Sequence, residues 1–401
     1  MKERTIRTIC RCLIPGILAA LLLCAATAAA EGVTRCLLIG YDRFVLMPST
    51  EPASANNTEM MNALLEEFLP GPVIITRRVN EPGTVDGFEA LAMETFAGAD
   101  EKDTALVYLS THGVLTRDGE QPRLALLLSD GTYQESLGPE RLRAILDRIP
   151  GKKILILDAC HSGAAIGEGS EAAVNFFREG PYRVLVSSGA EEVSWFWNAG
   201  RDAYSGTGYF TAALNSALRA SDPEQIDPDG SGSICLAELT GRLREIHGAS
   251  TVYCWPEDSR EPMFRMPPDR HAGALLRGLA FGAPMPEGDA IILPIRFRAE
   301  EPVRLVYQLA PWRDGRWDFE HAVRLPDREK TGLTRGLLSP GPKERTIRLS
   351  PQSLGEEHRA LMQIISLHGE DLTPAAEGSR VIGPAPGEGN CLLGQENPEG
   401  R

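Results

Sequence analysis

The fold of this chain is decided by one stretch, KKILILDACHSG at residues 152–163. Its apolar run, Ile154 to Leu157, has no polar interruption, which is typical of a strand buried on both faces of a parallel sheet. The small and polar residues from Asp158 to Gly163 then end the strand. Ligands and catalytic groups collect at the carboxyl ends of strands in open α/β sheets, so we expect a functional site around Cys160.

A second stretch, ALVYLSTHG at residues 105–113, has the same design and ends in His112-Gly113. A cysteine by itself is most often a small buried hydrophobe. Here a strand delivers His112 about fifty residues upstream of the strand that delivers Cys160, which is the spacing of a caspase-type nucleophile and its histidine. The sequence therefore predicts a Cys–His pair at one edge of the sheet.

Such a pair can hydrolyse a peptide bond. A thiolate forms readily beside an imidazole, and His112 would activate Cys160 or protonate the leaving amine. The backbone N–H groups of Gly113 and Cys160 are expected to form the oxyanion hole, since glycine lets the main chain approach a substrate closely. His161 is a poor base because adjacent side chains on extended backbone point apart, and we interpret it as a loop histidine.

Three motifs together resemble the caspase-fold peptidases: LLIG at 37–40, YLSTHG at 108–113 and LILDACHSG at 155–163. The Asp-x-Cys-His-Ser-Gly motif is most similar to the metacaspases and their bacterial relatives. The resemblance covers roughly residues 33–248, including the later segments 186–188 and 208–211. It implies a cysteine endopeptidase with His112 and Cys160 as its catalytic dyad.

The resemblance also implies a preference for Arg or Lys before the cleaved bond. In metacaspases the Asp two residues before the nucleophile helps to line an acidic pocket, and Asp158 stands there, where it would pair with a guanidinium. The alternative is that Asp158 only caps the loop backbone. The family also has an acidic residue at the start of the first helix, which we expect to begin at Asn56 or Asn57, and this chain places Asn57 at that position.

Other residues are candidates for the substrate pocket. Asp42, Glu191 and Glu192 are acidic groups that would compensate for Asn57, and Ser188 is a further substrate-binding candidate. The segment 163–180 reads as a mobile Gly-, Ala- and Glu-rich loop. Arg178 is its only basic residue, which makes it a candidate self-processing site beside the alternative of an ordinary exposed arginine.

A second motif, DPDGSGSICLAE at residues 227–238, has the spacing of a calcium-binding EF-hand loop. Oxygen ligands stand at positions 1, 3 and 5, glycine at position 6 and glutamate at position 12. The predicted metal ligands are Asp227, Asp229, Ser231, Ser233 and Glu238. The neutral Ser231 and the missing entering helix depart from the EF-hand pattern, so a turn with an N-capped helix is the alternative. The peptidase chemistry itself requires no cofactor.

Strands and helices alternate through the first part of the chain, which indicates a doubly wound, mostly parallel α/β sheet with helices on both faces. We assign residues 31–282 to this peptidase domain. The period then changes to two, and Asp314-Gly315 marks a hairpin turn between Trp312 and Trp317. Residues 285–383 are therefore expected to form an all-β, sandwich-like accessory domain, followed by a disordered tail at 384–401.

The N-terminus has the pattern of a secretory signal peptide at residues 1–30. Four basic residues precede an apolar run from Leu13 to Cys24, and Ala28-Ala29-Ala30 offers a cleavage site. We expect cleavage and an extracytoplasmic location, with a retained anchor or a lipid-modified Cys24 as alternatives. Among the remaining cysteines, Cys36 is expected in the core, and Cys235–Cys254 is a conceivable disulfide.

The formal charge of −14 argues against a nucleic-acid-binding surface, which requires a basic footprint. Protein or peptide substrates are the expected partners, and no membrane span is expected once the signal is removed. The sequence thus predicts an exported cysteine endopeptidase that cleaves after Arg or Lys. Two alternatives from other classes are a catalytically silent caspase-like binding module and a calcium-regulated interaction protein.

Overall fold

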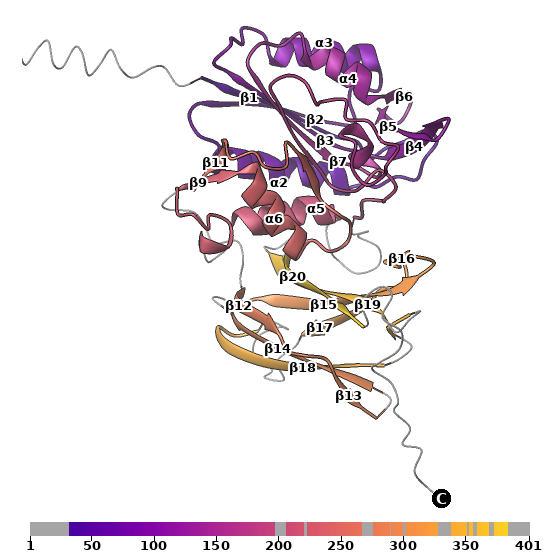
Figure 1. Cartoon of the computed structure of the whole chain (residues 1–401), viewed down its shortest axis with the longest axis vertical. Coiled ribbons are helices and arrows are strands. Elements are labelled where there is room, and N and C mark those ends of the chain that lie inside the picture. The colour runs from indigo at the N-terminus through magenta and orange to yellow at the C-terminus, as the bar shows by residue number, and fades with distance from the viewer. Residues whose placement is uncertain are drawn as a thin grey trace, which may run out of the picture.

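The chain forms an α/β domain and a β domain in the computed structural model (Figure 1). The structure describes residues 32–196, 206–219, 223–266, 276–288, 290–299, 302–327, 338–350, 353–355, 359–368 and 373–383. The predicted signal peptide and the predicted tail lie outside the described residues. Within the described part of the chain, no helix is long and apolar enough to cross a membrane.

A six-stranded sheet with the order β10-β8-β7-β3-β1-β2 forms the centre of the α/β domain. All neighbouring strands are parallel except β10, which runs antiparallel to β8. Unbroken apolar runs build the central strands because both faces of the sheet are covered. The strands are β1 (Thr34–Gly40), β2 (Val73–Val79), β3 (Thr104–Ser110), β7 (Lys152–Asp158), β8 (Tyr182–Val186) and β10 (Tyr253–Trp255).

Helices cover both faces of this sheet. One face packs against α2 (Ala53–Phe68), α5 (Tyr209–Leu218) and α6 (Leu236–Ile246), and the other against α3 (Val85–Thr95) and α4 (Pro139–Leu146). Successive strand residues point to opposite faces. Accordingly Leu38 and Tyr108 join the first core, and Leu37 and Val107 join the second. The predicted doubly wound architecture is confirmed.

The chain between β3 and β7 begins with a small antiparallel sheet. It consists of β4 (Gly113–Asp118), β5 (Gln121–Ser129) and β6 (Gln134–Leu137). His112 lies directly between β3 and β4, and its carbonyl oxygen accepts a hydrogen bond of 3.0 Å from the Leu127 N–H on β5. The small sheet therefore fixes the backbone of His112.

The segment 163–180 is more ordered than its composition predicts. A 3₁₀ helix, η1 (Ser162–Ala165), starts it, and Ile166 and Asn175 form an isolated bridge. The side chain of Phe177 is fully buried, with its ring 5.1 Å from that of Tyr182. A few buried apolar side chains therefore tie this segment to the core, while its mobility stays a prediction.

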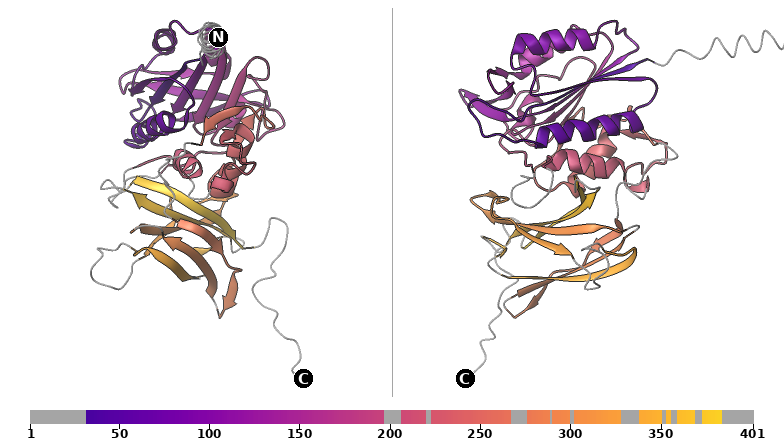
Figure 2. Two further views of the ribbon diagram at one scale, coloured as in Figure 1. Left: turned by 90° about the vertical axis from the view of Figure 1, so that its left-hand side faces the viewer. Right: turned by 180° about the vertical axis from the view of Figure 1, so that it is seen from behind.

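Two antiparallel sheets stack face to face in the β domain (Figures 1 and 2). One contains β12 (Leu276–Phe281), β13 (Met285–Glu287), β14 (Ala290–Ala299) and β18 (Gly341–Leu349). The other contains β15 (Arg304–Arg313), β16 (Arg316–Trp317), β17 (Val323–Asp327), β19 (Ala360–His368) and β20 (Thr373–Ile382). Apolar side chains of both sheets share one core, so the domain is a sandwich.

The predicted boundary between the domains is wrong by one strand. The sequence predicts it after residue 282, but β12 pairs with β14 and belongs to the β domain. The Gly- and Pro-rich stretch at 282–288 contains a turn and the short strand β13 inside the β domain. Composition cannot distinguish such a turn from an interdomain linker, because the same residue types serve both.

β15 is buried on both of its faces. Leu305, Tyr307 and Leu309 point into the sandwich core, whereas Val306 and Ala310 pack with Tyr209 and other residues of the α/β domain. Polar contacts reinforce this second interface. The Gln308 amide donates to the Tyr209 hydroxyl and to the Gln363 side chain, and Gln363 Nε2 donates to the His247 carbonyl oxygen at 3.1 Å. The two domains therefore share a packed and hydrogen-bonded boundary.

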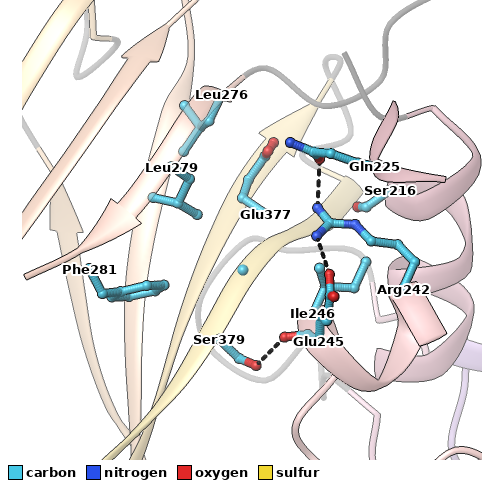
Figure 3. Close-up of a pocket in the computed structure, with 11 residues that line it drawn as sticks. Ser216, Gln225, Arg242, Glu245, Ile246, Leu276, Leu279, Phe281, Glu377 and Ser379 are labelled. Atoms are coloured by element: carbon cyan, nitrogen blue, oxygen red, sulfur yellow. Dashed lines mark hydrogen bonds and ion pairs between the residues drawn. The ribbon is translucent and has the colours of Figure 1, made fainter. Parts of the chain in front are cut away.

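A small cavity of about 150 Å³ lies along the same boundary, between α6 on one side and β12 and β20 on the other (Figure 3). The Arg242 guanidinium donates to both Gln225 and Glu245 there. The Ser379 hydroxyl of β20 donates to the Glu245 carbonyl oxygen at 3.4 Å. Two of the three guanidinium nitrogens of Arg242 are thus bonded within the α/β domain, and Nε is buried without a hydrogen-bond partner.

Candidate active site

The register of β3 and β7 brings the two predicted catalytic residues to one edge of the sheet. Ser110, the last residue of β3, pairs with Asp158, the last residue of β7. His112 follows Ser110 by two residues, and Cys160 follows Asp158 by two residues. Both side chains line one cavity of about 80 Å³ at the carboxyl end of the sheet. The structure thus brings His112, Cys160 and Asp158 together.

The thiol of Cys160 is half-buried. It donates a hydrogen bond of 3.4 Å to the carbonyl oxygen of Ser194, on the loop that follows β8. Burial raises the pKa of this thiol above its ordinary value, and backbone hydrogen bonds of Ser194, of Cys160 itself and of Gly113 oppose that rise. The thiol is therefore neutral at rest and needs a base before it can attack a carbonyl carbon.

Gly113 lies directly against Cys160. A Cβ atom at this position would come within 1.8 Å of the Cys160 carbonyl oxygen, so only glycine fits. A backbone hydrogen bond lowers a thiol pKa when the N–H points at the sulfur. The backbone N–H groups of Gly113 and Cys160 both act on the thiol in this way.

The imidazole of His112 is oriented by its Nε2 atom. Nε2 lies 3.0 Å from the carbonyl oxygen of Pro48, and because a carbonyl can only accept, Nε2 carries the proton and Nδ1 the lone pair. The ring also packs against Phe44, with 4.5 Å between the ring centroids. Burial lowers the pKa of His112, which keeps the ring neutral at neutral pH. A neutral imidazole of fixed tautomer is suited to general-base work.

Asp158 forms the charged end of the cavity. Its Oδ2 accepts from Thr211 at 2.7 Å, from Asn57 at 3.2 Å and from Tyr108 at 3.5 Å, and its Oδ1 accepts from Ser194 at 3.2 Å. All four donors are neutral. Burial raises the pKa of Asp158 to about 6, although hydrogen bonds from Thr211, Ser194 and Tyr108 oppose the rise. Among the described residues, no cationic side chain forms an ion pair with this carboxylate.

Asn57 lies in the cavity beside Asp158, but not at the start of its helix. α2 begins at Ala53, so Asn57 stands one turn further on and points inward. Its Nδ2 donates to Ser110 and to Asp158, and its Oδ1 accepts from the Thr207 hydroxyl and the Gly208 N–H, both at 2.7 Å. The expected helix start was late because Pro52 and Ala53 give no capping signal.

The other substrate-binding candidates are used elsewhere. Asp42 is buried, and its carboxylate accepts from Thr50 and from backbone N–H groups at the start of α2. Ser188 donates to the Ala159 carbonyl oxygen at 3.0 Å and stabilises the loop that carries Cys160. Neither residue lines the cavity. The assignment of both to substrate is therefore not supported by their geometry.

Glu191 and Glu192 do not supply the acidic group that the family has in place of Asn57. Glu191 forms an ion pair with Arg117 at the surface, 3.0 Å between the charged atoms. The Glu192 carboxylate accepts from the Gly189 and Thr251 backbone N–H groups, each at 2.9 Å. His161, interpreted as a loop histidine, has a left-handed backbone and directs Nδ1 to the Ala190 carbonyl oxygen.

Sequence reasoning did not find several residues of this site. Ser194, Thr211 and Pro48 contact the reactive groups directly, yet they come from loops and a helix far from the two motifs. The family resemblance includes the segments 186–188 and 208–211 but implies no role for their single residues. The register of β3 and β7 would have drawn attention to Ser110, because it stands opposite Asp158.

The predicted calcium loop has a compact arrangement of carboxylates. One oxygen each of Asp227, Asp229 and Glu238 lies within 4.8 Å of the others. Gly232, at position 6, has a φ of +76°, the left-handed conformation that the sharp turn of such loops requires. Glu238 Oε1 is buried without a hydrogen-bond partner, and Oε2 accepts from the Cys235 N–H at the start of α6.

Cys235 and Cys254 do not form the disulfide that the sequence made conceivable. Cys235 and Cys254 are both free and buried, Cys235 at the start of α6 and Cys254 in β10. Cys36 is fully buried in β1, as expected.

One family model and several solved structures are similar to this chain. The family model described as the caspase domain matches residues 33–237. No curated protein matches the sequence significantly. Similar solved structures, each 14% identical, include a protein from Geobacter sulfurreducens (TM-score 0.37; 52% of this chain and 87% of that chain covered), caspase-1 from Spodoptera frugiperda (0.37; 53% and 76%) and pro-sf-caspase-1 (0.38; 54% and 81%).

The matched residues run from the start of the central sheet to the first turn of α6, and they include the whole cavity around Cys160. The resemblance inferred from the three motifs is thereby confirmed, and with it the fold of a cysteine peptidase. The chain belongs to the caspase domain family.

Proposed function

We propose that this protein is a cysteine endopeptidase that cleaves after Arg or Lys with Cys160 and His112 as its dyad. The observation that carries the proposal is that Cys160, His112 and Asp158 line one cavity. Hydrolysis beside a basic residue requires a nucleophile, a neutral base and a carboxylate that is not already in an ion pair.

The reaction begins with attack of Cys160 Sγ on the carbonyl carbon of the scissile bond. The thiol proton passes to Nδ1 of His112, because Nε2 already carries its proton toward Pro48. The N–H groups of Gly113 and Cys160 donate to the oxyanion. The tetrahedral intermediate collapses, the C–N bond breaks, and His112 protonates the leaving amine. Water, deprotonated by His112, then hydrolyses the thioester and regenerates the thiol.

Asp158 would select the basic side chain. An ionised carboxylate held by neutral donors in a buried site gains most from a cation that enters the cavity. A guanidinium would pair with it bidentately, whereas an acidic side chain would be repelled. Where the family has a second acidic residue, Asn57 instead donates a hydrogen bond to Asp158. The preference for a basic side chain would therefore depend on the Asp158 carboxylate alone.

A fluorogenic panel with Arg, Lys, Asp or Ala before the scissile bond tests the proposal. We expect hydrolysis of the Arg and Lys substrates, with a loss of at least a hundredfold in Cys160→Ala and His112→Ala. An Arg-directed peptidyl electrophile should label Cys160 once per chain. Hydrolysis that survives in Cys160→Ala would refute the mechanism. Absence of both hydrolysis and labelling would favour a catalytically silent binding module.

Calcium is a second proposed ligand, bound by the loop from Asp227 to Glu238. The oxygen spacing within 4.8 Å suits ligands that lie 2.3–2.6 Å from one ion. The unpartnered Glu238 Oε1 is a natural ligand, and the Ser231 and Ser233 hydroxyls, 3.1 Å apart, would turn toward the ion. The metal would supply charge neutralisation that fixes the start of α6.

Thermal unfolding with calcium and with a chelator tests this site without reference to activity. Calcium at a hundred times its Kd should stabilise the protein by about 2.7 kcal/mol. Asp227→Asn and Glu238→Gln should remove the effect, and Asp118→Asn, an exposed acid outside the loop, should keep it. An identical unfolding temperature with calcium and chelator would exclude the site.

Export is the remaining element of the proposal. The basic residues Lys2, Arg4 and Arg7, the apolar run and the Ala28–Ala30 site support a cleaved signal peptide. N-terminal sequencing of the protein from its natural compartment should begin at Glu31. A retained leader, or lipid on Cys24, would favour a membrane anchor.

A further inference from the structure

The loop after β8 and the β domain line a second, larger cavity of about 600 Å³. The α/β domain contributes Glu191 to Trp195 and residues near Thr251. The β domain contributes Trp312 and Trp317, which flank the β15–β16 turn, and Arg359. Trp195 lines both this cavity and the cavity around Cys160. The larger cavity therefore borders the candidate active site at Trp195.

The charged side chains that line this larger cavity are already engaged: Glu191 pairs with Arg117, and Arg244 pairs with Glu257 and donates to the Val252 carbonyl oxygen. The Arg359 guanidinium lies over the rings of Trp312 and Trp317, 4.6 Å and 5.5 Å from their centroids. The Glu192 carboxylate accepts three hydrogen bonds from Gly189 and Thr251. Charges satisfied in this way attract a charged ligand weakly, so the cavity presents mainly aromatic and aliphatic surface.

Its aromatic walls have a fixed arrangement. The rings of Trp312 and Trp317 lie 4.6 Å apart at 69°, in an edge-to-face contact. The ring of Trp195 packs 4.8 Å from that of Phe319, and the Trp195 carbonyl oxygen accepts from the Tyr209 N–H at 2.9 Å. All three tryptophans remain half-buried rather than covered. Rigid, partly exposed aromatic side chains are the usual anchors of a polypeptide ligand.

We propose that this cavity binds substrate residues that flank the cleaved bond, and that it accepts an aromatic or large aliphatic side chain. The inference rests on the proposed peptidase function and adds a specificity determinant supplied by the β domain. The cavity volume lies in the range of ordinary ligand sites. An extended peptide advances about 3.3 Å per residue, so a chain held at Cys160 reaches past Trp195 within a few residues.

Binding of peptides to the full-length Cys160→Ala variant tests the inference directly. Each fluorescent peptide has a fixed Arg and carries Trp, Leu or Ala at one flanking position, on either side. At one position Trp and Leu should bind at least tenfold more tightly than Ala. Trp317→Ala should reduce this preference to within twofold, and Trp317→Phe should restore most of it. Tyr133→Ala, which removes an exposed aromatic ring elsewhere, should leave it unchanged.

Photocrosslinking supplies a measurement that needs no substitution in the β domain. A peptide with benzoylphenylalanine at the preferred position should label residues between 312 and 317 or between 193 and 195. Equal binding of Trp and Ala peptides at every position, or labelling confined to other segments, would overturn the inference. Loss of a dimer in Trp317→Ala, measured by sedimentation with peptide binding unchanged, would show instead that a second copy of the chain occupies the cavity.

The two proposals fail separately. Hydrolysis of Arg substrates without any flanking preference would remove the larger cavity from substrate binding and keep the peptidase. Trp317-dependent binding without hydrolysis would keep the cavity as a peptide site and remove the peptidase.

Discussion

Asp158 carries a buried charge that its own surroundings only partly stabilise. Since burial raises its pKa to about 6, the carboxylate is protonated in mild acid and ionised at neutral pH. We therefore predict that kcat/KM for an Arg substrate of the free enzyme rises with pH, with a midpoint near 6. Citrulline is the uncharged analogue of Arg, so kcat/KM for a citrulline substrate should not depend on the ionisation of Asp158. Its rise with pH should reflect only His112, whose pKa is below its ordinary value.

Asp158→Asn supplies the complementary measurement. The variant should lose the limb near pH 6 and lose at least tenfold in kcat/KM for Arg at pH 7.5, because the ion pair is gone. Alkylation of Cys160 by iodoacetamide should continue. An unchanged Arg-to-citrulline ratio in this variant would mean that Asp158 only supports the loop.

Gly113 tests the oxyanion hole. A Cβ at this position would lie 1.8 Å from the Cys160 carbonyl oxygen, so Gly113→Ala must move one of the two backbones. We predict a fall in kcat of a hundredfold or more, the usual cost of a lost oxyanion donor. Gly241→Ala is the matched control, since nothing lies within 4 Å of that Cβ and alanine favours the helix. Wild-type kcat in Gly113→Ala would contradict this role.

At the scale of single elements, Arg178 lies on the segment 163–180. This segment must unfold locally before the peptide bond after Arg178 can be cleaved. It is exposed, but the neighbouring Phe177 is fully buried against Tyr182. We predict slow cleavage of the Arg178–Glu179 bond during incubation of the active enzyme. Phe177→Ala should accelerate it, because local opening costs less once this anchor is removed.

Mass spectrometry of the incubated chain checks this prediction. The new end should be missing in Cys160→Ala and in Arg178→Gln. An intact chain after prolonged incubation of enzyme that hydrolyses Arg substrates would show that the segment is not a processing site.

The sequence predicts the strands and helices that carry the motifs, because each has its own hydrophobic period. Cys160 and His112 could be named since their motifs end two buried strands. Ser194 and Thr211 could not, because their contacts with Cys160 and Asp158 depend on how distant loops and α5 pack. β10 and β12 could not be predicted for a related reason. Short strands form because they pair with a neighbouring strand, and that pairing cannot be read from their own sequence.

At the scale of the whole molecule, the β domain contacts the loop after β8, which lies against the nucleophile. Phe319 packs against Trp195 and Tyr209, with ring centroids 4.8 Å and 5.2 Å apart. The residue before Trp195, Ser194, contacts both Cys160 and Asp158. We predict that Phe319→Ala lowers kcat/KM about tenfold and alters the rate of Cys160 alkylation, because the loop loses its support.

Phe319→Leu should recover part of the activity by refilling the site. Val323→Ala, which shortens an exposed side chain of the same domain, serves as the control. If Phe319→Ala retained wild-type kcat/KM and alkylation rate while folded, the loop would not depend on the β domain.

The burial of β15 on both faces limits how freely the two halves of this protein can be exchanged. An accessory domain joined by a linker alone can be moved between enzymes without loss. Without the α/β domain, Gln308 would lose its hydrogen bond to Tyr209, and Gln363 would lose its hydrogen bond to the His247 carbonyl oxygen. Val306 would also face water. Any relative that keeps the peptidase fold but replaces the β domain must therefore redesign the exposed faces of α5 and of the segment after α6 as well. We therefore expect the peptidase domain of this protein to lose stability when its β domain is exchanged alone.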